Sequence, residues 1–126
     1  MAEILVVDDE ETIRIVLSEL FRAHGHDVTT APDGVTAIDL IKSRPELDLV
    51  VTDMRMSPVD GMQVLESSKE CREDLPVIVL TAFANEYAMD SSFESGAFAY
   101  HAKPFKADSL LQSVSHAIAG PEPIAV

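Results

Sequence analysis

Short runs of β-branched residues alternate with amphipathic helical segments along this chain, and this alternation limits its fold more than any other feature. The expected strands cover residues 4–7, 27–30, 47–52, 77–80 and 97–101. The expected helices cover residues 11–23, 34–43, 61–71, 85–95 and 106–119. A βα unit repeated five times predicts an α/β fold, with a five-stranded doubly wound parallel sheet and five helices on its two faces.

The length and the last residues of the chain indicate one domain. A chain of 126 residues can bury a core without disulfides or structural metals. Residues 120–126, GPEPIAV, carry two prolines and no helical period, so we expect a C-terminal tail or the start of a linker there. The expected domain therefore covers residues 1–119.

Charge and cysteine content narrow the partners and the compartment. With 22 acidic against 9 basic residues the formal charge is −13, which disfavours direct contact of this domain with nucleic acid or an anionic membrane. The single cysteine, Cys71, lies in the polar stretch SSKECRED, and we interpret it as a free thiol in a reducing compartment. The N-terminal MAEILVV has no basic segment, and no apolar run could span a bilayer. We therefore expect a cytoplasmic protein.

Polar and charged residues follow four of the five expected strands. They are Asp8-Asp9-Glu10 after the first strand, Asp53 after the third, Thr81 after the fourth and Lys103-Pro104 after the fifth. In a sheet with the flavodoxin-like strand order 2-1-3-4-5, these ends lie at one edge, and the first and third strands are adjacent where the strand order reverses. Carboxylates, a hydroxyl and an ammonium group are then expected to converge.

The carboxylates of Asp8, Asp9 and Asp53 would repel one another in such a site. Two like charges about 4 Å apart repel by roughly 4 kcal/mol at an effective dielectric constant near 20. A divalent cation would relieve this repulsion, and carboxylates with an incomplete protein shell suit Mg²⁺, which often bridges to phosphate oxygens. Asp53 could then act as a nucleophile toward a phosphoryl group, with Lys103 and Thr81 holding two further oxygens.

Each of these residues has a simpler explanation when it is taken alone. An acidic pair before a helix is more often a helix cap, a threonine at a strand end is more often a turn residue, and a Lys-Pro pair usually marks a loop. Their joint placement at the ends of the right strands favours a common site.

Four stretches of the sequence resemble one known family. They are VVDDE, VVTDMRM followed by Asp60-Gly61, VLTA, and KPF. Together they are typical of the receiver domains of two-component response regulators, and the resemblance covers residues 3–119.

This resemblance implies a phosphorylation-activated signalling switch. Asp53 would accept a phosphoryl group from a phosphohistidine on a sensor histidine kinase or phosphotransfer protein. Asp8, Asp9, Asp53 and the backbone carbonyl of Arg55 would bind Mg²⁺. Such a domain is not a conventional enzyme: with Asp53 and Lys103 as its catalytic residues, it catalyses its own phosphoryl transfer and a slow autodephosphorylation.

The resemblance also implies how the signal leaves the site. Thr81 and Lys103 match the switch hydroxyl and the phosphate-pairing lysine, and Tyr100 matches an aromatic residue that turns inward when the threonine moves. The repacking would alter an output surface on the helix, strand and helix expected at 85–95, 97–101 and 106–119. Arg55 and Phe83 match two positions that tune phosphoryl lifetime, and a bulky Phe83 would obstruct an attacking water.

The segment from residue 81 to residue 105 is similar to the receivers of nitrogen-regulation type sigma-54 activators. We therefore expect a downstream effector domain or protein and a role in transcription, although a stand-alone receiver would look much the same. A phosphorylation-dependent homodimer is a further expectation. In this family Lys103-Pro104 is commonly a cis peptide. Pro58 stands one place later than the usual proline, so the loop around Ser57 is expected to differ in shape.

Other uses of this fold fit the residues less well. A flavin-binding electron carrier needs glycines and hydroxyls where Asp8-Asp9-Glu10 stand, and a dinucleotide enzyme needs G-x-G-x-x-G there. A hydrolase of the haloacid dehalogenase class needs a second aspartate where Arg55 stands. The remaining alternative is a pseudo-receiver, an interaction module that switches without phosphorylation. The presence of all five site residues argues against it: Asp8, Asp9, Asp53, Thr81 and Lys103.

Overall fold

Five parallel strands form the centre of this computed structural model, which describes residues 2–120. The strands are β1 (Glu3–Val7), β2 (Asp27–Ala31), β3 (Leu49–Asp53), β4 (Val77–Thr81) and β5 (Ala99–Ala102). They pair in the order β2-β1-β3-β4-β5, and every neighbouring pair is parallel. The expected flavodoxin-like strand order is therefore confirmed. The expected C-terminal tail lies outside the described residues apart from Gly120.

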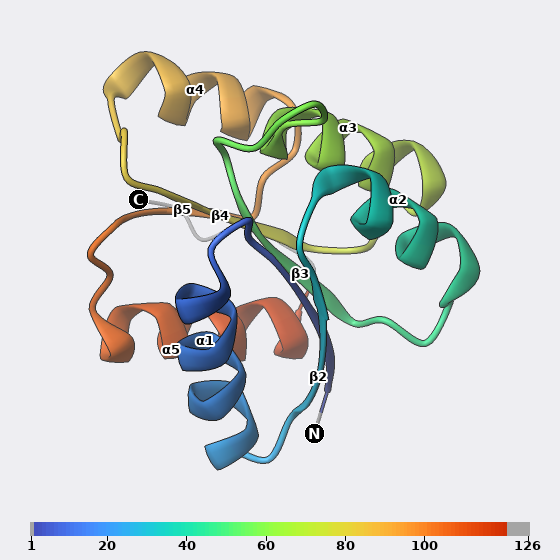
Figure 1. Ribbon diagram of the computed structural model, residues 1–126, viewed down its shortest axis with the longest axis vertical. Helices are drawn as coiled ribbons and strands as arrows, with labels where there is room; N and C mark the ends of the chain where they lie inside the picture. Colours follow the sequence, from blue (N-terminus) through green and yellow to red (C-terminus); the bar gives the residue numbers. More distant parts are fainter. Residues whose placement is uncertain (1, 121–126) are drawn as a thin grey trace.

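Five helices cover the two faces of this sheet. They are α1 (Glu11–Ala23), α2 (Gly34–Ser43), α3 (Gly61–Cys71), α4 (Glu86–Glu94) and α5 (Ala107–Ala119). Helices α1 and α5 lie on one face, and α2, α3 and α4 lie on the other (Figure 1). The structure thus confirms the doubly wound α/β fold with five helices. Among residues 2–120, no helix has the length and apolarity needed to cross a membrane.

The core consists of two apolar layers, one on each face of the sheet. Every residue of the central strands β3 and β4 is buried, as expected for strands covered by helices on both faces. Alternate residues of β1 enter opposite layers: Ile4 packs with Phe21 of α1 and Leu110 of α5, whereas Leu5 packs with Leu65 of α3. The sheet is therefore held rigidly between its helices, which fixes the positions of the strand ends.

Two strands begin two residues later than the sequence pattern indicates. We expected strands from residues 47 and 97, but β3 begins at Leu49 and β5 at Ala99. The Leu47 N–H donates to a carbonyl in the turn after α2 (3.1 Å), and the Ala97 N–H donates to a carbonyl of α4 (2.9 Å). Both side chains are buried. Their apolar character therefore matches that of strand residues, although their backbone hydrogen bonds belong to turns. All other bounds agree within one residue.

Three helices on the same face begin with a side-chain cap. Asp33, Asp60 and Asn85 each accept a hydrogen bond from the backbone N–H three residues later, at 2.7, 2.9 and 2.8 Å. Each satisfies a backbone donor at the start of its helix. Because each of these helices follows a strand that ends at the same edge of the sheet, the caps determine where the connecting loops end.

Helix α3 begins directly against the backbone of β3. The Gly61 N–H donates to the carbonyl of Met54 at 2.9 Å. A Cβ atom on Gly61 would lie 2.1 Å from the carbonyl oxygen of Asp53, so no residue with a side chain fits at this position. Glycine is therefore required here for close approach of two backbone segments.

Candidate functional site

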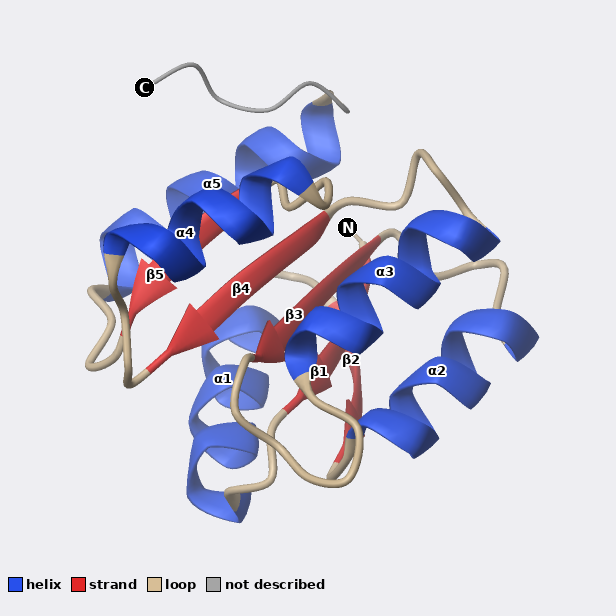
Figure 2. Cartoon of the chain, turned by 90° about the horizontal axis from the view of Figure 1, so that it is seen from above, coloured by secondary structure: helices blue, strands red, loops and turns tan. Residues whose placement is uncertain are grey.

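The strand ends bring the predicted site residues to one edge of the sheet. Asp8 follows β1, Asp53 is the last residue of β3, Thr81 is the last residue of β4, and Lys103 follows β5. Figure 2 shows the strands of the sheet pointing toward this same edge. The parallel arrangement therefore collects side chains that are up to 95 residues apart in sequence.

The Lys103 ammonium group lies between two buried carboxylates. Its Nζ atom is 2.8 Å from Oδ2 of Asp8 and 3.1 Å from Oδ1 of Asp53. Asp8 is 1% exposed and Asp53 is 5% exposed. Neither carboxylate has been left without a partner, although Asp53 ends a strand that is otherwise apolar except for Thr52. One protonated lysine thus neutralises part of a pair of buried negative charges.

Asp8 is held in place by its neighbours as well as by Lys103. Its second carboxylate oxygen accepts a hydrogen bond from the Glu10 N–H at 2.9 Å. Its backbone carbonyl accepts one from the Arg14 guanidinium of α1 at 2.7 Å. Sequence reasoning missed Arg14, because a side chain that bonds a backbone carbonyl leaves no pattern of residue types to detect.

The environment shifts the pKa of both Asp53 and Lys103. Burial raises the pKa of the Asp53 carboxyl above its ordinary value, and the Asp8 charge adds to this, while Lys103 partly offsets it. Burial opposes the charged form of Lys103, but its contacts with Asp8 and Asp53 outweigh burial and raise the pKa of the ammonium group. Lys103 therefore remains a cation, and Asp53 carries its charge at a cost.

We expect the Asp53→Asn variant to be more stable than the wild type at neutral pH. The gain should be on the order of 1 kcal/mol, or about 4 °C in Tm for a domain of this size. Because the pKa of Asp53 is raised in the folded state, its ionised form destabilises that state above the folded-state pKa, and the penalty disappears below the unfolded-state pKa.

Thermal unfolding of both proteins between about pH 3 and pH 7 measures this effect. The difference in Tm should increase as the pH rises through the raised pKa of Asp53. A variant no more stable than the wild type at neutral pH would mean that Lys103 fully compensates the Asp53 charge.

Thr81 is buried beside this charged group. It is 1% exposed, and its hydroxyl oxygen accepts a hydrogen bond from the Phe83 N–H at 3.1 Å. Phe83 is 57% exposed, and the Arg55 guanidinium lies over its ring, 4.2 Å from the ring centroid. The two residues predicted to tune phosphoryl lifetime are therefore in direct contact, which the sequence did not indicate.

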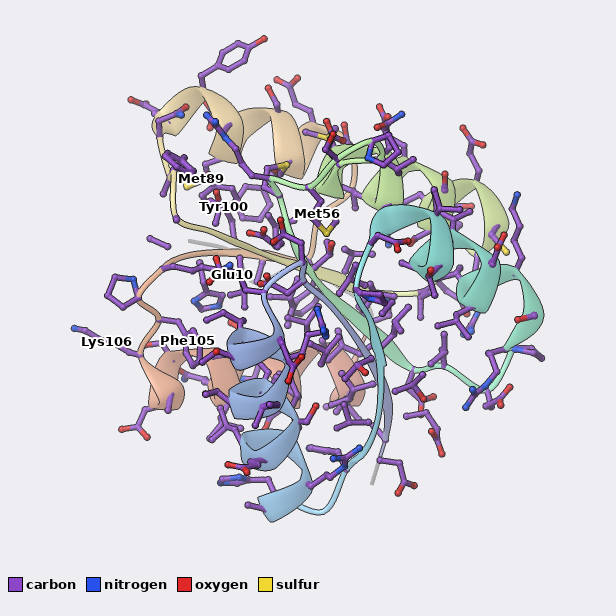
Figure 3. All side chains as sticks on the ribbon, viewed as in Figure 1. Glu10, Met56, Met89, Tyr100, Phe105 and Lys106 are labelled. Carbon is purple, nitrogen blue, oxygen red and sulfur yellow. The ribbon has the colours of Figure 1, made fainter. Side chains whose placement is uncertain are left out.

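Tyr100 lies on the face of the sheet that α4 covers. It lines a groove with Ala84 and Met89, between α4 and β5, and Figure 3 shows Met89 next to it. Its hydroxyl oxygen is buried, and no group among residues 2–120 hydrogen bonds to it. The ring therefore already directs its hydroxyl into the protein in this structure.

Two proline-containing loops at this edge, those after β3 and β5, include a cis peptide bond. Lys103-Pro104 is cis, as expected. Ser57-Pro58 is also cis, which the sequence did not predict.

Comparisons with known proteins identify the family. The family model described as "Response regulator receiver domain" matches residues 4–115. The chain belongs to this family. A crystal structure of a response regulator receiver domain protein from Clostridium thermocellum has a TM-score of 0.90 and 32% sequence identity, over 94% of this chain and 95% of that one. The expectation drawn from the four sequence stretches is therefore confirmed.

The relatives of this receiver domain differ in length. Sporulation initiation phosphotransferase F of Bacillus subtilis is 38% identical over 113 residues, which are 89% of this chain and 90% of that protein. The DNA-binding transcriptional regulator NtrC of Escherichia coli is 35% identical over 113 residues, but these are only 24% of its length. The chain thus spans nearly the whole of one kind of relative and about a quarter of the other.

The acidic residues of this receiver domain fit a hard divalent cation. Carboxylate oxygens of Asp8, Asp9 and Glu10 lie within 4.8 Å of one another, and the side chains of Asp9 and Glu10 are exposed. Asp9 also lines a solvent-accessible cleft together with Arg55 and Asp60. Oxygen ligands with an open side are what Mg²⁺ requires, because it retains several waters. Glu10 was not among the residues predicted to bind the ion.

Proposed function

We propose that this receiver domain is a switch activated by phosphorylation of Asp53. The donor would be a phosphohistidine on a sensor histidine kinase or a phosphotransfer protein. The observation that carries this proposal is the position of Lys103, whose Nζ atom contacts both Asp53 and Asp8. It provides a fixed positive charge beside a buried carboxylate, and the next two residues in the chain, Met54 and Arg55, line a solvent-accessible cleft.

The proposed reaction is a transfer of one phosphoryl group. A carboxylate oxygen of Asp53 forms a bond to phosphorus while the bond between phosphorus and the imidazole nitrogen breaks, and the nitrogen keeps the electron pair. The phosphoryl group adds negative oxygens at Asp53. Lys103 would pair with one of them, and the Thr81 hydroxyl would donate to another.

Four groups are proposed to hold the magnesium ion for this reaction. They are the carboxylates of Asp8, Asp9 and Asp53 and the backbone carbonyl of Arg55. When bound, Mg²⁺ supplies positive charge that offsets the charge on the phosphoryl oxygens and lets these acids remain ionised together.

The conformational response is proposed to pass through Thr81 and Tyr100. Movement of the Thr81 hydroxyl toward a phosphoryl group would change the space next to Tyr100 and repack α4 against β5. The surface formed by α4, β5 and α5 would then bind the effector domain or a second copy of the chain. Helix α4 is suited to shift, because Ser92 is its only fully buried residue. Arg55 and Phe83 would tune the lifetime of the phosphorylated state.

The proposed output is regulation of transcription, supported by the similarity to NtrC over 90% of this chain. A second output is favoured by a different observation, since the chain matches Sporulation initiation phosphotransferase F over nine tenths of both proteins. In that case the phosphoryl group would pass on to another protein. Transfer from the phosphorylated domain to a histidine phosphotransfer protein of the same organism would distinguish a relay from a transcriptional output.

Incubation with acetyl phosphate and Mg²⁺ tests the proposed function. We expect a mass gain of one phosphoryl group, measured on the intact protein, and no gain when a chelator removes the metal. A gain that requires Mg²⁺ supports the switch. The absence of any gain would instead support the pseudo-receiver, an interaction module that switches without phosphorylation.

A further inference from the structure

An arginine and a phenylalanine from two different loops contact each other beside the proposed acceptor. The Arg55 guanidinium lies 4.2 Å from the centroid of the Phe83 ring. Arg55 belongs to the loop between β3 and α3, and Phe83 belongs to the loop between β4 and α4. The contact therefore joins the loop that follows Asp53 to the loop that follows Thr81.

Arg55 makes this contact in acidic surroundings. Asp9 and Asp60 line the same cleft as Arg55, and the chain has a net charge of −13. Among residues 2–120, however, the Arg55 side chain forms neither an ion pair nor a hydrogen bond. The aromatic face is its partner. Cation–π contacts at exposed sites stabilise a conformation by about a two- to fivefold change in an equilibrium constant.

Phe83 is bonded to the two segments that the proposed switch would move. Its N–H donates to the hydroxyl of Thr81 at 3.1 Å, and its carbonyl accepts from the Asn85 side-chain amide at 3.4 Å. Asn85 in turn caps α4 by accepting a hydrogen bond from the Ala88 N–H at 2.8 Å. The ring that Arg55 covers thus belongs to the residue that connects Thr81 with α4.

We propose that Arg55 and Phe83 form a clasp that holds the loop between β4 and α4 in its unphosphorylated arrangement. This inference rests on the proposed function. Movement of the Thr81 hydroxyl toward a phosphoryl group on Asp53 either breaks its bond to the Phe83 N–H or carries Phe83 along. In the clasp Phe83 is carried along, so its ring leaves its position under Arg55. The clasp therefore opposes the phosphorylated arrangement and sets how readily the domain responds.

Three substitutions separate this clasp from simple shielding of the site by a bulky side chain. Phe83→Leu keeps an apolar side chain of similar bulk but removes the π face. Phe83→Trp enlarges the π face and strengthens a cation–π contact. Arg55→Met keeps an unbranched side chain and the backbone carbonyl but removes the guanidinium group and its charge. A clasp makes the effects at Phe83 depend on the residue at 55, whereas shielding does not.

Beryllofluoride with Mg²⁺, which binds noncovalently where a phosphoryl group would attach, is the probe. Its apparent Kd should fall about two- to fivefold in Phe83→Leu and rise in Phe83→Trp. Both changes should vanish in the Arg55→Met background. Tyr87→Leu, which removes an aromatic residue 82% exposed on α4, is the matched control and should leave Kd unchanged.

The outcomes separate the clasp from the function on which it rests. Binding by the wild type together with equal changes in both backgrounds, or with no change, would overturn the clasp and leave the proposed function standing. Failure of the wild type to bind beryllofluoride would overturn both.

Discussion

Asp53→Asn is expected to take up no phosphoryl group from acetyl phosphate, a loss of at least about 10³-fold in rate. The amide has nearly the shape of the carboxylate, so Lys103 keeps its contact with Asp8 and the fold is unchanged. The asparagine amide, however, lacks the anionic oxygen that attacks phosphorus. The measurement is the mass of the intact protein after incubation with acetyl phosphate and Mg²⁺.

Asp33→Asn provides the matched control for this variant. Asp33 caps α2 through its side-chain oxygen, and asparagine caps a helix equally well. The substitution removes one carboxylate without touching the proposed site, so uptake should equal that of the wild type. Phosphorylation of Asp53→Asn at the wild-type rate would show that another residue is the acceptor, and peptide mapping would locate it.

Gly61→Ala is expected to lower the free energy of unfolding by more than about 3 kcal/mol, or more than about 10 °C in Tm. The added Cβ would lie 2.1 Å from the carbonyl oxygen of Asp53 and 2.7 Å from Cα of Met54. Both are backbone atoms, so a side-chain rotation cannot relieve the clash. Either α3 or the end of β3 has to move, and phosphoryl uptake should fall with stability.

Urea unfolding followed by circular dichroism measures this loss, with Gly120→Ala as the control. A Cβ on Gly120 would meet no atom of residues 2–120 within 4 Å, so the stability of this variant should remain within about 0.5 kcal/mol of the wild type. A Gly61→Ala protein as stable as this control would show that the start of α3 can shift freely.

Much of the fold was predictable because its signals are local. Alternation of apolar strands with amphipathic helices defines the parallel sheet, and the strand ends then define one edge. The predicted starts of β3 and β5 are wrong for a related reason. Leu47 and Ala97 are as buried as strand residues, but their backbone hydrogen bonds complete turns, and hydrophobicity does not distinguish the two.

The site was predictable in its residue types but not in its pairings. The sequence indicated that Lys103 and the acids would converge, whereas the assignment of Lys103 to Asp8 at 2.8 Å depends on packing across 95 residues of chain. Arg14 bonds a backbone carbonyl, and Arg55 packs on an exposed ring. Neither contact depends on a characteristic pattern of residue types, so no sequence motif predicts these two contacts.

The placement of Lys103 between Asp8 and Asp53 also bears on how the chain matures. Small metal-dependent domains often stay unfolded until their ion arrives, since the ion is what holds their ligands together. In this chain the Lys103 ammonium group already holds Asp8 and Asp53 together. We therefore expect the newly made polypeptide to reach its native structure in a magnesium-poor environment, and the proposed binding of the ion would follow folding.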